Sequence, residues 1–484
     1  MSFKIYTFMG AFDRFVEYTL CSNKKMPATH NAVFTELGSK GQADKLMIAE
    51  TPEESQETFW RHVHDKHSPF GLEPVEFDIQ ASQPRFNGSA KYAFARQGDL
   101  CWQTYAHYNL PGIVGIKDNK VVRGADAPYW HPSTGYRLTR QATLAIGGNV
   151  IDTLTDTYMY VWEALTHKPG KKLGEMIGCF DTVQEQQAFS KRSQELWVPL
   201  PFSFSREAAL ALPVVSLSFH QMHIELDFCS RNDAIVNPSG AQVFVRPDGM
   251  TDDEIEAALD SSVGSRGRQI SLLQDSDLRC TVEANYVYLE NDERNKFGKG
   301  TFTQLVDELQ IIPAQAYYAA AGASETTPSV KINPRMQFNN VIMEYITVVR
   351  REASDTKNYF DFSGPVDEAS GTVLDPLRDI GIRFNNTPRV NTRSAKYYRL
   401  VQPYQYHTNV PKDFIYVWSY AKDPENGLNP TGGANHTRLE NVNVEYHLDP
   451  RLFSPDAPNA EVITFGRSKN LLTYKFGMIH KKLV

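Results

Sequence analysis

The chain has 484 residues, of which 41% are hydrophobic and 22% are charged, and its formal net charge is −7. This composition excludes a disordered chain, and the length predicts two or three domains. The chain carries no Lys/Arg-rich tail, so we do not expect it to bind nucleic acid directly.

The N-terminal part of the chain differs from the rest. Residues 1–55 are mixed and polar, and they predict an arm that is at most partly helical. They lack the apolar core of a secretory signal, and no run in the chain approaches the roughly 18 apolar residues of a membrane helix. From residue 56 onward, strand patterns dominate.

Alternating side chains predict the first strands. Residues 92–96 and 100–108 alternate around a turn at 97–99, which predicts a hairpin. Residues 142–151 predict a second strand pair that turns at Gly147-Gly148. Residues 155–166 instead place apolar side chains at helical spacing, with Thr155 or Asp156 as the N-cap, and predict a short inserted helix.

The segment Leu196–Phe228 is the most informative part of the first half. Residues 215–219 alternate between apolar and polar, the phase reverses after Gln221, and residues 222–228 alternate again. Each half predicts a strand with one buried face. A reversal of phase indicates a bulge or a tight turn between the strands.

The second half repeats this style after a polar break at residues 232–240. Strands are predicted at 282–288, 341–349, 414–420 and 442–448, and the second of these is apolar on both faces, which indicates a central strand. The prediction is an all-β chain with an arm at 1–55, a first β-sandwich at 56–232 and a second at 233–484, with short inserted helices and long loops. Periodicity alone does not distinguish jelly rolls from other sandwiches.

Several residues suggest chemistry but fit plainer interpretations. His62, His64 and His67 resemble a metal-ligand cluster, but the next glutamate, Glu73, is too distant, so we interpret them as solvated histidines. His220 and His223 flank the reversal of phase and are interpreted as hydrogen-bonded or exposed strand residues.

Other motifs also lack catalytic context. Ser133, Ser205 and Ser216 sit in no G-x-S-x-G elbow, and residues 147–149 are a turn rather than a phosphate loop. The acidic and basic side chains of residues 292–294 predict an ion pair. We therefore predict no catalytic, cofactor-binding or metal-binding residue, and no enzyme.

Neither the cysteines nor the glycosylation sequons indicate a functional site. The five cysteines are odd in number, widely spaced and without a CxxC pair, which predicts free thiols from a reducing compartment. They are Cys21, Cys101, Cys179, Cys229 and Cys280. The Asn-x-Ser/Thr sequons at Asn87, Asn385 and Asn435 are interpreted as chance matches.

A series of motifs resembles, in the same order, the double jelly-roll major capsid proteins of nucleocytoplasmic large DNA viruses. Each motif is weak alone, and their order makes the resemblance specific. The motifs are Gly41–Asp44 with Thr58–Trp60 and His67–Phe70, Gly98–Leu100 with Leu110–Gly112, Ile146–Asp152, Trp162–Thr166 with Met176–Gly178, Leu196–Phe219, Asp292–Arg294, Tyr398–Thr408, and Pro430–Gly432 with Asn435 and Thr437–Leu439.

The resemblance implies two consecutive eight-stranded jelly rolls and a structural role in a virion. It further implies homotrimeric capsomers of near-sixfold outline that tile an icosahedral shell, assembled in the host cytoplasm. We expect the arm, residues 1–55, to contact minor capsid proteins or an inner membrane. About forty residues precede the Gly41 motif, more than the family pattern has, and low strand signal predicts surface loops at 319–330 and 354–372.

Two alternatives remain open at the level of sequence. One is a two-domain β-sandwich of bicupin type, a metal enzyme or a carbohydrate-binding protein. The other is a β-rich scaffold protein unrelated to viruses. A bound metal or sugar would indicate the first, and the lack of hexagonal arrays would indicate the second.

Overall fold

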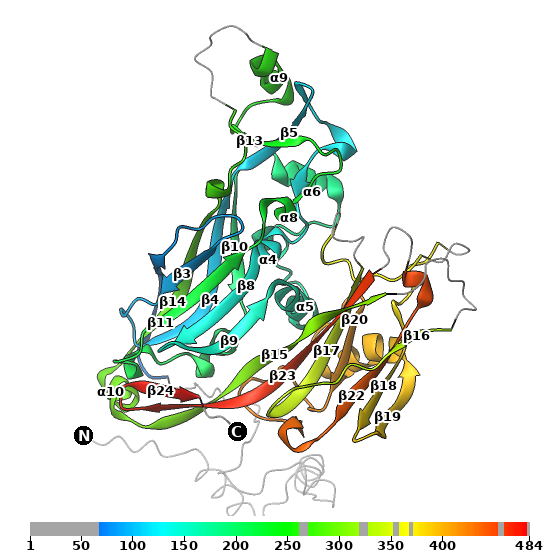
Figure 1. Ribbon diagram of the computed structural model, residues 1–484. Helices are drawn as coiled ribbons and strands as arrows, with labels where there is room; N and C mark the ends of the chain where they lie inside the picture. The colour runs from blue at the N-terminus through cyan, green and yellow to red at the C-terminus, as the bar shows by residue number, and fades with distance from the viewer. Residues whose placement is uncertain are drawn as a thin grey trace, which may run out of the picture. The chain divides into compact units, whose positions relative to one another are not determined.

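The computed structural model describes residues 67–260, 270–318, 328–351, 358–366, 371–453 and 459–481. They form two antiparallel β-sandwiches that follow one another along the chain (Figure 1). The predicted arm at 1–55 lies outside the described residues, together with His62, His64 and much of both predicted surface loops.

The first sandwich pairs a four-stranded sheet with a five-stranded one. The four-stranded sheet has the order β1 (Phe70–Glu76), β14 (Arg279–Leu289), β4 (Leu100–Leu110) and β10 (Gln194–Leu200). The five-stranded sheet has the order β2 (Asp78–Ala81), β3 (Ser89–Ala93), β11 (Met222–Phe228), β8 (Thr139–Ile146) and β9 (Asn149–Thr155).

The second sandwich has the same plan. Its larger sheet has the order β15 (Phe302–Tyr318), β23 (Asn459–Lys475), β17 (Val341–Arg351) and β20 (Ile415–Ser419), extended by β21 (Ala434–Asn435) and β24 (Met478–Lys481). The other sheet has the order β16 (Val330–Ile332), β22 (Val442–Leu448), β18 (Leu377–Phe384) and β19 (Thr387–Ser394).

Both sandwiches share one topology. If the eight principal strands of each are counted along the chain, one sheet has the order 1-8-3-6 and the other 2-7-4-5, with β2 as an added edge strand in the first sandwich. This is the strand order of a jelly roll. The predicted fold class, two consecutive eight-stranded jelly rolls, is therefore confirmed.

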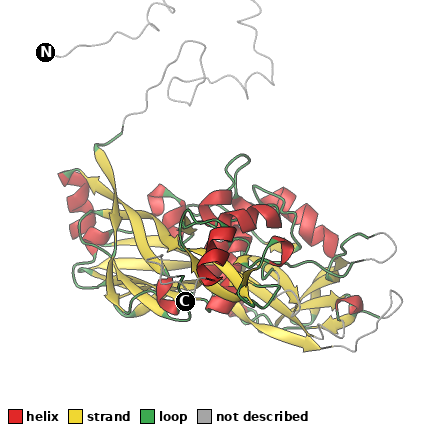
Figure 2. Ribbon diagram, turned by 90° about the horizontal axis from the view of Figure 1, so that it is seen from above, coloured by secondary structure: helices red, strands yellow, loops and turns green. Residues whose placement is uncertain are grey.

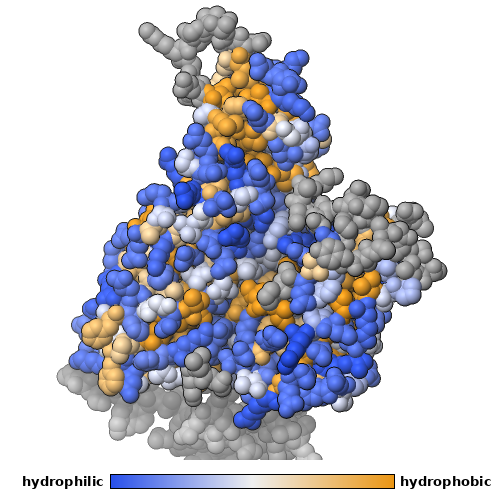
Figure 3. Space-filling model, viewed as in Figure 1, coloured by the Kyte–Doolittle hydropathy of each residue, from blue (hydrophilic) through white to orange (hydrophobic). Residues whose placement is uncertain are grey.

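Smaller elements join these sheets. A three-stranded sheet of β13 (Gln242–Arg246), β5 (Gly112–Lys117) and β6 (Lys120–Val121) lies with α9 (Asp252–Asp260) at one end of the first sandwich. This end is far from α10 (Asn291–Lys299) and β24 (Figure 1). Its small core contains Val114, Val121 and Ile255, and Figure 3 shows hydrophobic residues gathered over this sheet. A further pair consists of β7 (Tyr129–Trp130) and β12 (Ile235–Val236).

The helices are short and gather mainly along one side of the strands (Figure 2). The α-helices are α4 (Thr134–Leu138), α5 (Asp156–Thr166), α6 (Val183–Ser190), α7 (Ser203–Arg206), α8 (Arg231–Ala234), α9, α10 (Asn291–Lys299) and α11 (Gln402–Tyr406). The single turns of 3-10 helix are η1 (Gly124–Asp126), η2 (Gly174–Ile177), η3 (Ala208–Leu210), η4 (Val214–Ser216), η5 (Asp275–Asp277), η8 (His436–Arg438) and η9 (Pro450–Leu452). A π-helical turn, η7 (Tyr397–Val401), leads into α11.

Local sequence signals account for two of these elements. The side chain of Thr155 caps α5 by accepting a hydrogen bond from the Tyr158 amide at 3.3 Å, as the sequence predicts. The β8–β9 hairpin turns at Gly147 and Gly148, whose φ angles are +60° and +83°. Glycine accepts these angles without strain, so the predicted turn is also confirmed.

Two tertiary pairings differ from the predictions. Strands β3 and β4 do not form a hairpin, because β3 pairs with β2 and β11 while β4 pairs with β10 and β14 in the opposite sheet. Strand β14 completes the first sandwich, so the boundary follows residue 289 and not residue 232 as expected. Alternation identifies a strand, but it does not identify the sheet that the strand joins.

The segment Leu196–Phe228 contains two strands, as predicted, but the first strand is β10 and not residues 215–219. The predicted strand at 215–219 is wrong, because η4 at Val214–Ser216 turns the chain there. Pro201 and Pro213 cannot donate to a ladder, and the residues between them form α7 and η3 instead. The second predicted strand is β11, which buries every other side chain.

Candidate functional site

The interface between the two sandwiches holds the largest group of buried charges that we find in the described residues. Helix α5, from the first sandwich, lies against the second (Figure 1). The ring of Tyr158 lies 5.5 Å from that of Phe465 on β23. Tyr160 stacks on Phe360 at 4.5 Å, and its hydroxyl donates to Asp413 at 2.9 Å. Helix α5 therefore joins the two sandwiches within one chain.

The surface that receives α5 is the outer face of the sheet β15-β23-β17-β20. Its side chains are almost fully buried, and they belong to the same apolar cluster as the first sandwich. They are Ile346, Val348, Ile415, Val417 and Phe465. The opposite face of this sheet packs into a second cluster inside the second sandwich. Strand β17 is thus buried on both faces, as its apolar pattern predicts.

A chain of ion pairs crosses this interface. Arg467 lies between two carboxylates, at 2.8 Å from Asp307 and 2.7 Å from Glu344. Arg206, from α7 of the first sandwich, pairs with the same Asp307 at 3.1 Å. The guanidinium groups of Arg206 and Arg467 both lie 4.2 Å from the ring of Trp162 on α5. Charged hydrogen bonds and cation–π contacts therefore connect the two sandwiches.

The network continues into the second sandwich. Lys469 contacts Asp307 at 2.6 Å, and His407 lies 3.0 Å from both Glu344 and Glu425. Burial alone would raise the pKa of Glu344, but His407 and Arg467 outweigh burial and lower it to about 2. Burial alone would lower the pKa of His407, but the two glutamates raise it to about 9. At neutral pH the network is therefore charged throughout.

This arrangement suits a structural role better than acid–base chemistry. Asp307, Glu344 and Arg467 are at most 4% exposed, and each carboxylate is held by at least one cation. A general acid or base must reach a substrate and exchange a proton near neutral pH. Neither condition is met here, so the network acts as a connection between the sandwiches.

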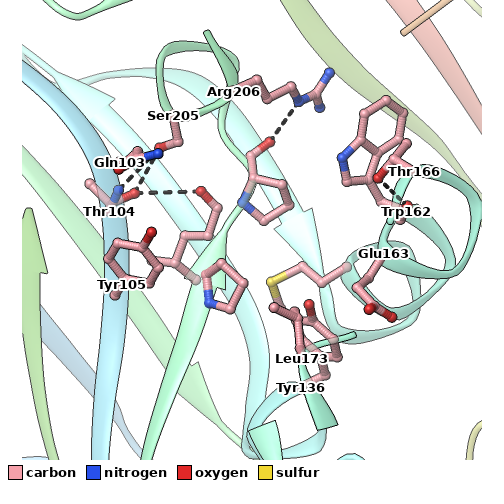
Figure 4. A pocket seen from close by; sticks show the side chains of 14 residues that line it. Gln103, Thr104, Tyr105, Tyr136, Trp162, Glu163, Thr166, Leu173, Ser205 and Arg206 are labelled. Carbon is pink, nitrogen blue, oxygen red and sulfur yellow. Dashed lines mark hydrogen bonds between the residues drawn. The ribbon is translucent and has the colours of Figure 1, made fainter. Parts of the chain in front are cut away.

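A cavity of about 250 Å³ lies beside α5 (Figure 4). Ser205 pairs with the hydroxyl of Thr104 at 3.0 Å rather than with a base. Arg206 donates to the carbonyl of Pro201 at 3.1 Å, and the one carboxylate in the lining, Glu163, has a pKa raised by burial. The lining of this cavity holds no nucleophile–base pair of the kind that acyl transfer needs.

The residues singled out in the sequence are dispersed. His67 is exposed, His223 is half-buried on β11, and the Nδ1 atom of His220 accepts a hydrogen bond from the Ile479 amide at 3.2 Å. Ser216 donates to the Phe297 carbonyl at 2.7 Å. Within the described part of the chain, no group of three His, Cys, Asp or Glu side chains is arranged to hold a metal ion.

Two further predictions can be compared with the structure. Arg294 forms an ion pair at 3.0 Å, as predicted for residues 292–294, but its partner is Asp99 and not a neighbour in that segment. The four cysteines in the described residues are free. Burial raises the pKa of Cys229 and Cys280 to about 12, so these thiols are poor nucleophiles. None of the described helices is both long and apolar enough to cross a membrane.

The interface network has no clear signature in the sequence. Glu344 stands inside the apolar run 341–349, and one charge in a central strand is a signal, because a buried charge needs a partner. Its partner Arg467 is more than a hundred positions away. No pattern of spacing brings the two together.

Comparisons with known proteins identify the family. The model "Major capsid protein N-terminus" matches residues 58–290, and the model "Large eukaryotic DNA virus major capsid protein" matches residues 293–479. The two matches meet just after β14, where the first sandwich ends. Together they span almost all of the chain from residue 58 to residue 479.

Individual relatives and solved structures agree. The major capsid protein of Pyramimonas orientalis virus is 23% identical over 87% of this chain and 93% of its own length. That of Wiseana iridescent virus is 25% identical over 80% of this chain and 78% of its own length.

Among solved structures, PBCV-1 VP54 has a TM-score of 0.66 at 18% identity, covering 88% of this chain and 100% of that one. The Faustovirus major capsid protein has a TM-score of 0.59 at 11% identity, and the match covers 92% of this chain and 96% of that one. These two likenesses show the fold. With both family models matched in order along it, the chain belongs to the major capsid proteins of large eukaryotic DNA viruses, which are structural proteins of the virion and not enzymes.

Proposed function

We propose that this chain forms homotrimeric capsomers with a pseudo-hexagonal outline, and that these tile an icosahedral virus shell. The observation that carries the proposal is the repeat of one jelly-roll topology within a single chain. Three such chains around a threefold axis would present six similar sandwiches. A trimer with this six-cornered outline can pack into a hexagonal array, although its own symmetry is a closed threefold.

The joint between the two sandwiches supports this proposal. The two jelly rolls share one apolar cluster and the buried ion pairs around Arg467, so each chain supplies two sandwiches in a fixed relation. Because the two sandwiches of each chain are held in one relative position, the same contacts can repeat between chains around a ring. Trimers would then meet through further contacts to form the shell.

The remaining partners belong to the same proposal. We propose that residues 1–55 face the interior of the shell and contact minor capsid proteins or an inner membrane, and that assembly takes place in the host cytoplasm. The net charge of −7, without a basic tail, argues against direct contact with the genome.

Light scattering coupled to size-exclusion chromatography tests the trimer. The expected mass is three times the 54.8 kDa of one chain, and electron microscopy of concentrated protein or of particles should show hexagonal arrays. A stable monomer or dimer without arrays contradicts the proposal. For the arm, a protease should leave residues 1–55 uncut in intact particles and should remove them after disruption. Cleavage in intact particles would place the arm outside.

A further inference from the structure

The two jelly rolls carry equivalent helices that differ in their surroundings. In the first sandwich, α5 connects the fifth strand, β9, to the sixth, β10. In the second, η7 and α11 occupy the same connection between β19 and β20. Helix α5 is buried against the second sandwich, and eight of its eleven residues are buried.

Among the described residues, nothing covers the face of η7 and α11 in the same way. Leu400 is 42% exposed, Val401 is 38% exposed and Tyr404 is 79% exposed. Leu400 and Tyr404 are four positions apart, as are Tyr158 and Trp162, which contact the second sandwich from α5. Side chains at this spacing lie on the same face of a helix. This exposed face is called the Tyr404 face below.

We infer that the Tyr404 face binds a second copy of this chain, on the outer face of that copy's sheet β1-β14-β4-β10. The inference rests on the proposed trimer and names the contact that would hold it together. The template is the interface within the chain, where α5 binds the outer face of β15-β23-β17-β20. These two sheets have the same strand order, 1-8-3-6.

Repetition of one contact around a ring explains why this face would be exposed in a single chain. Suppose that the first sandwich of a neighbouring copy sits on the second sandwich of this chain in the same way as the second sandwich sits on the first. A contact like that of α5 then forms between every two successive sandwiches around the ring. Within one chain, only the first of these contacts can form. Three chains would close the ring with three internal contacts and three contacts between copies.

The receiving sheet has an outer face that suits this role. Leu196, Val198 and Leu200 of β10 point into the core, whereas Trp197 between them is 37% exposed. The ring of Trp197 stacks on that of His107 at 4.6 Å. A partly exposed aromatic pair on the edge strand β10 and its neighbour β4 is the kind of feature that anchors protein interfaces.

Charge is also complementary between the two surfaces. Lys396 is exposed one turn before Leu400. Beside the aromatic pair, β14 and β10 contribute the carboxylates of Glu283 and Glu195, against a single guanidinium, Arg279, at the end of β14. Such charges favour one register of docking more than they add affinity.

The first test is the oligomeric state of the double substitution Leu400→Asp with Tyr404→Asp. Two buried carboxylates at the contact should raise the dissociation constant of the trimer by at least about tenfold. Val150→Asp is the control, because Val150 is an apolar residue near the β8–β9 turn whose exposure, 53%, lies between those of Leu400 and Tyr404, and it belongs to neither surface. Circular dichroism and the urea midpoint of each variant report its folding.

The outcomes separate this inference from the proposed function. A folded double variant that is monomeric, while the wild type and Val150→Asp are trimers, supports the inference. A double variant that stays a trimer at all concentrations overturns the inference and leaves the trimer intact. A wild-type chain that is monomeric overturns the proposed trimer itself.

A second measurement covers the case in which the double variant fails to fold. A photo-crosslinking phenylalanine analogue at position 404 leaves the rest of the chain unchanged. Mass spectrometry of mixed isotope-labelled copies should find crosslinks to β10, β4 or β14 of the other copy. Crosslinks confined to the same chain, or to a different surface of the second copy, overturn the inference.

Discussion

Replacement of Arg467 by Met should destabilise the protein more than the loss of any exposed ion pair. Arg467 is 1% exposed and holds two carboxylates, those of Asp307 and Glu344, at 2.8 and 2.7 Å. Methionine has a similar length and no charge, so the substitution removes the attraction and leaves both carboxylates buried.

The magnitude follows from two opposing terms. At an effective dielectric constant near 20, two charges about 4 Å apart gain about 4 kcal/mol, so Arg467 gains roughly 8 kcal/mol from its two partners. Removing it from water costs several kcal/mol. Arg206, Lys469 and His407 continue to neutralise the carboxylates in part. The expected loss in the free energy of unfolding is about 3–5 kcal/mol.

Urea denaturation followed by tryptophan fluorescence measures this loss. The control is Arg123→Met, which breaks exposed pairs with Asp253 and Glu256; the side chain of Arg123 is 49% exposed, and those of its partners are 84% and 34% exposed. An exposed pair of this kind contributes about 0–1 kcal/mol. A double-mutant cycle with Glu344→Gln should give a coupling of about 1–3 kcal/mol between Glu344 and Arg467.

A stabilising role for the Arg467 network is refuted if Arg467→Met shifts the free energy of unfolding no more than Arg123→Met does. It is also refuted if the Glu344→Gln and Arg467→Met effects simply add. Either result would mean that the interface is held by apolar contacts alone.

Three further predictions concern pH and packing. The pKa of His407 is raised to about 9, so its contribution to the free energy of unfolding is complete below its unfolded pKa of 6.5 and is lost as pH rises through 9. The substitution His407→Gln should remove about 3 kcal/mol of this pH dependence. Urea midpoints measured from pH 6 to 10 check this prediction. Burial raises the pKa of the Asp152 carboxyl to about 6, so the fold loses stability as pH rises from 3.8 to about 6. Asp152→Asn should therefore stabilise the protein by roughly 1–3 kcal/mol at pH 8 and by nothing at pH 3, and equal effects at both would contradict this. On β11, Leu226→Ala should lower the free energy of unfolding by about 2–5 kcal/mol and His223→Ala by less than about 0.5 kcal/mol, since only Leu226 points into the core. Similar losses for the two substitutions would mean that the strand register is wrong.

Some of the fold could be read directly from the sequence because it depends on neighbours in the chain. The period of apolar residues predicts β11, β17 and β22, and the Thr155 cap predicts the start of α5. Steric limits on φ predict the turn at Gly147-Gly148. The order of the family motifs predicts the jelly rolls and the role in the virion, although not through any physical derivation.

The tertiary structure decided what depends on distant pairings. Whether β3 pairs with β4 or with β11, and whether β14 belongs to the first sandwich or the second, depends on backbone pairing between segments far apart in the chain. The phase reversal in Leu196–Phe228 looks like a bulge in the sequence, and only the fold shows a turn at η4. The network around Arg467 joins residues from five segments of the chain, which contribute Arg206, Asp307, Glu344, His407 and Arg467. The charges are visible in the sequence, but their pairing exists only where the second sandwich meets α5.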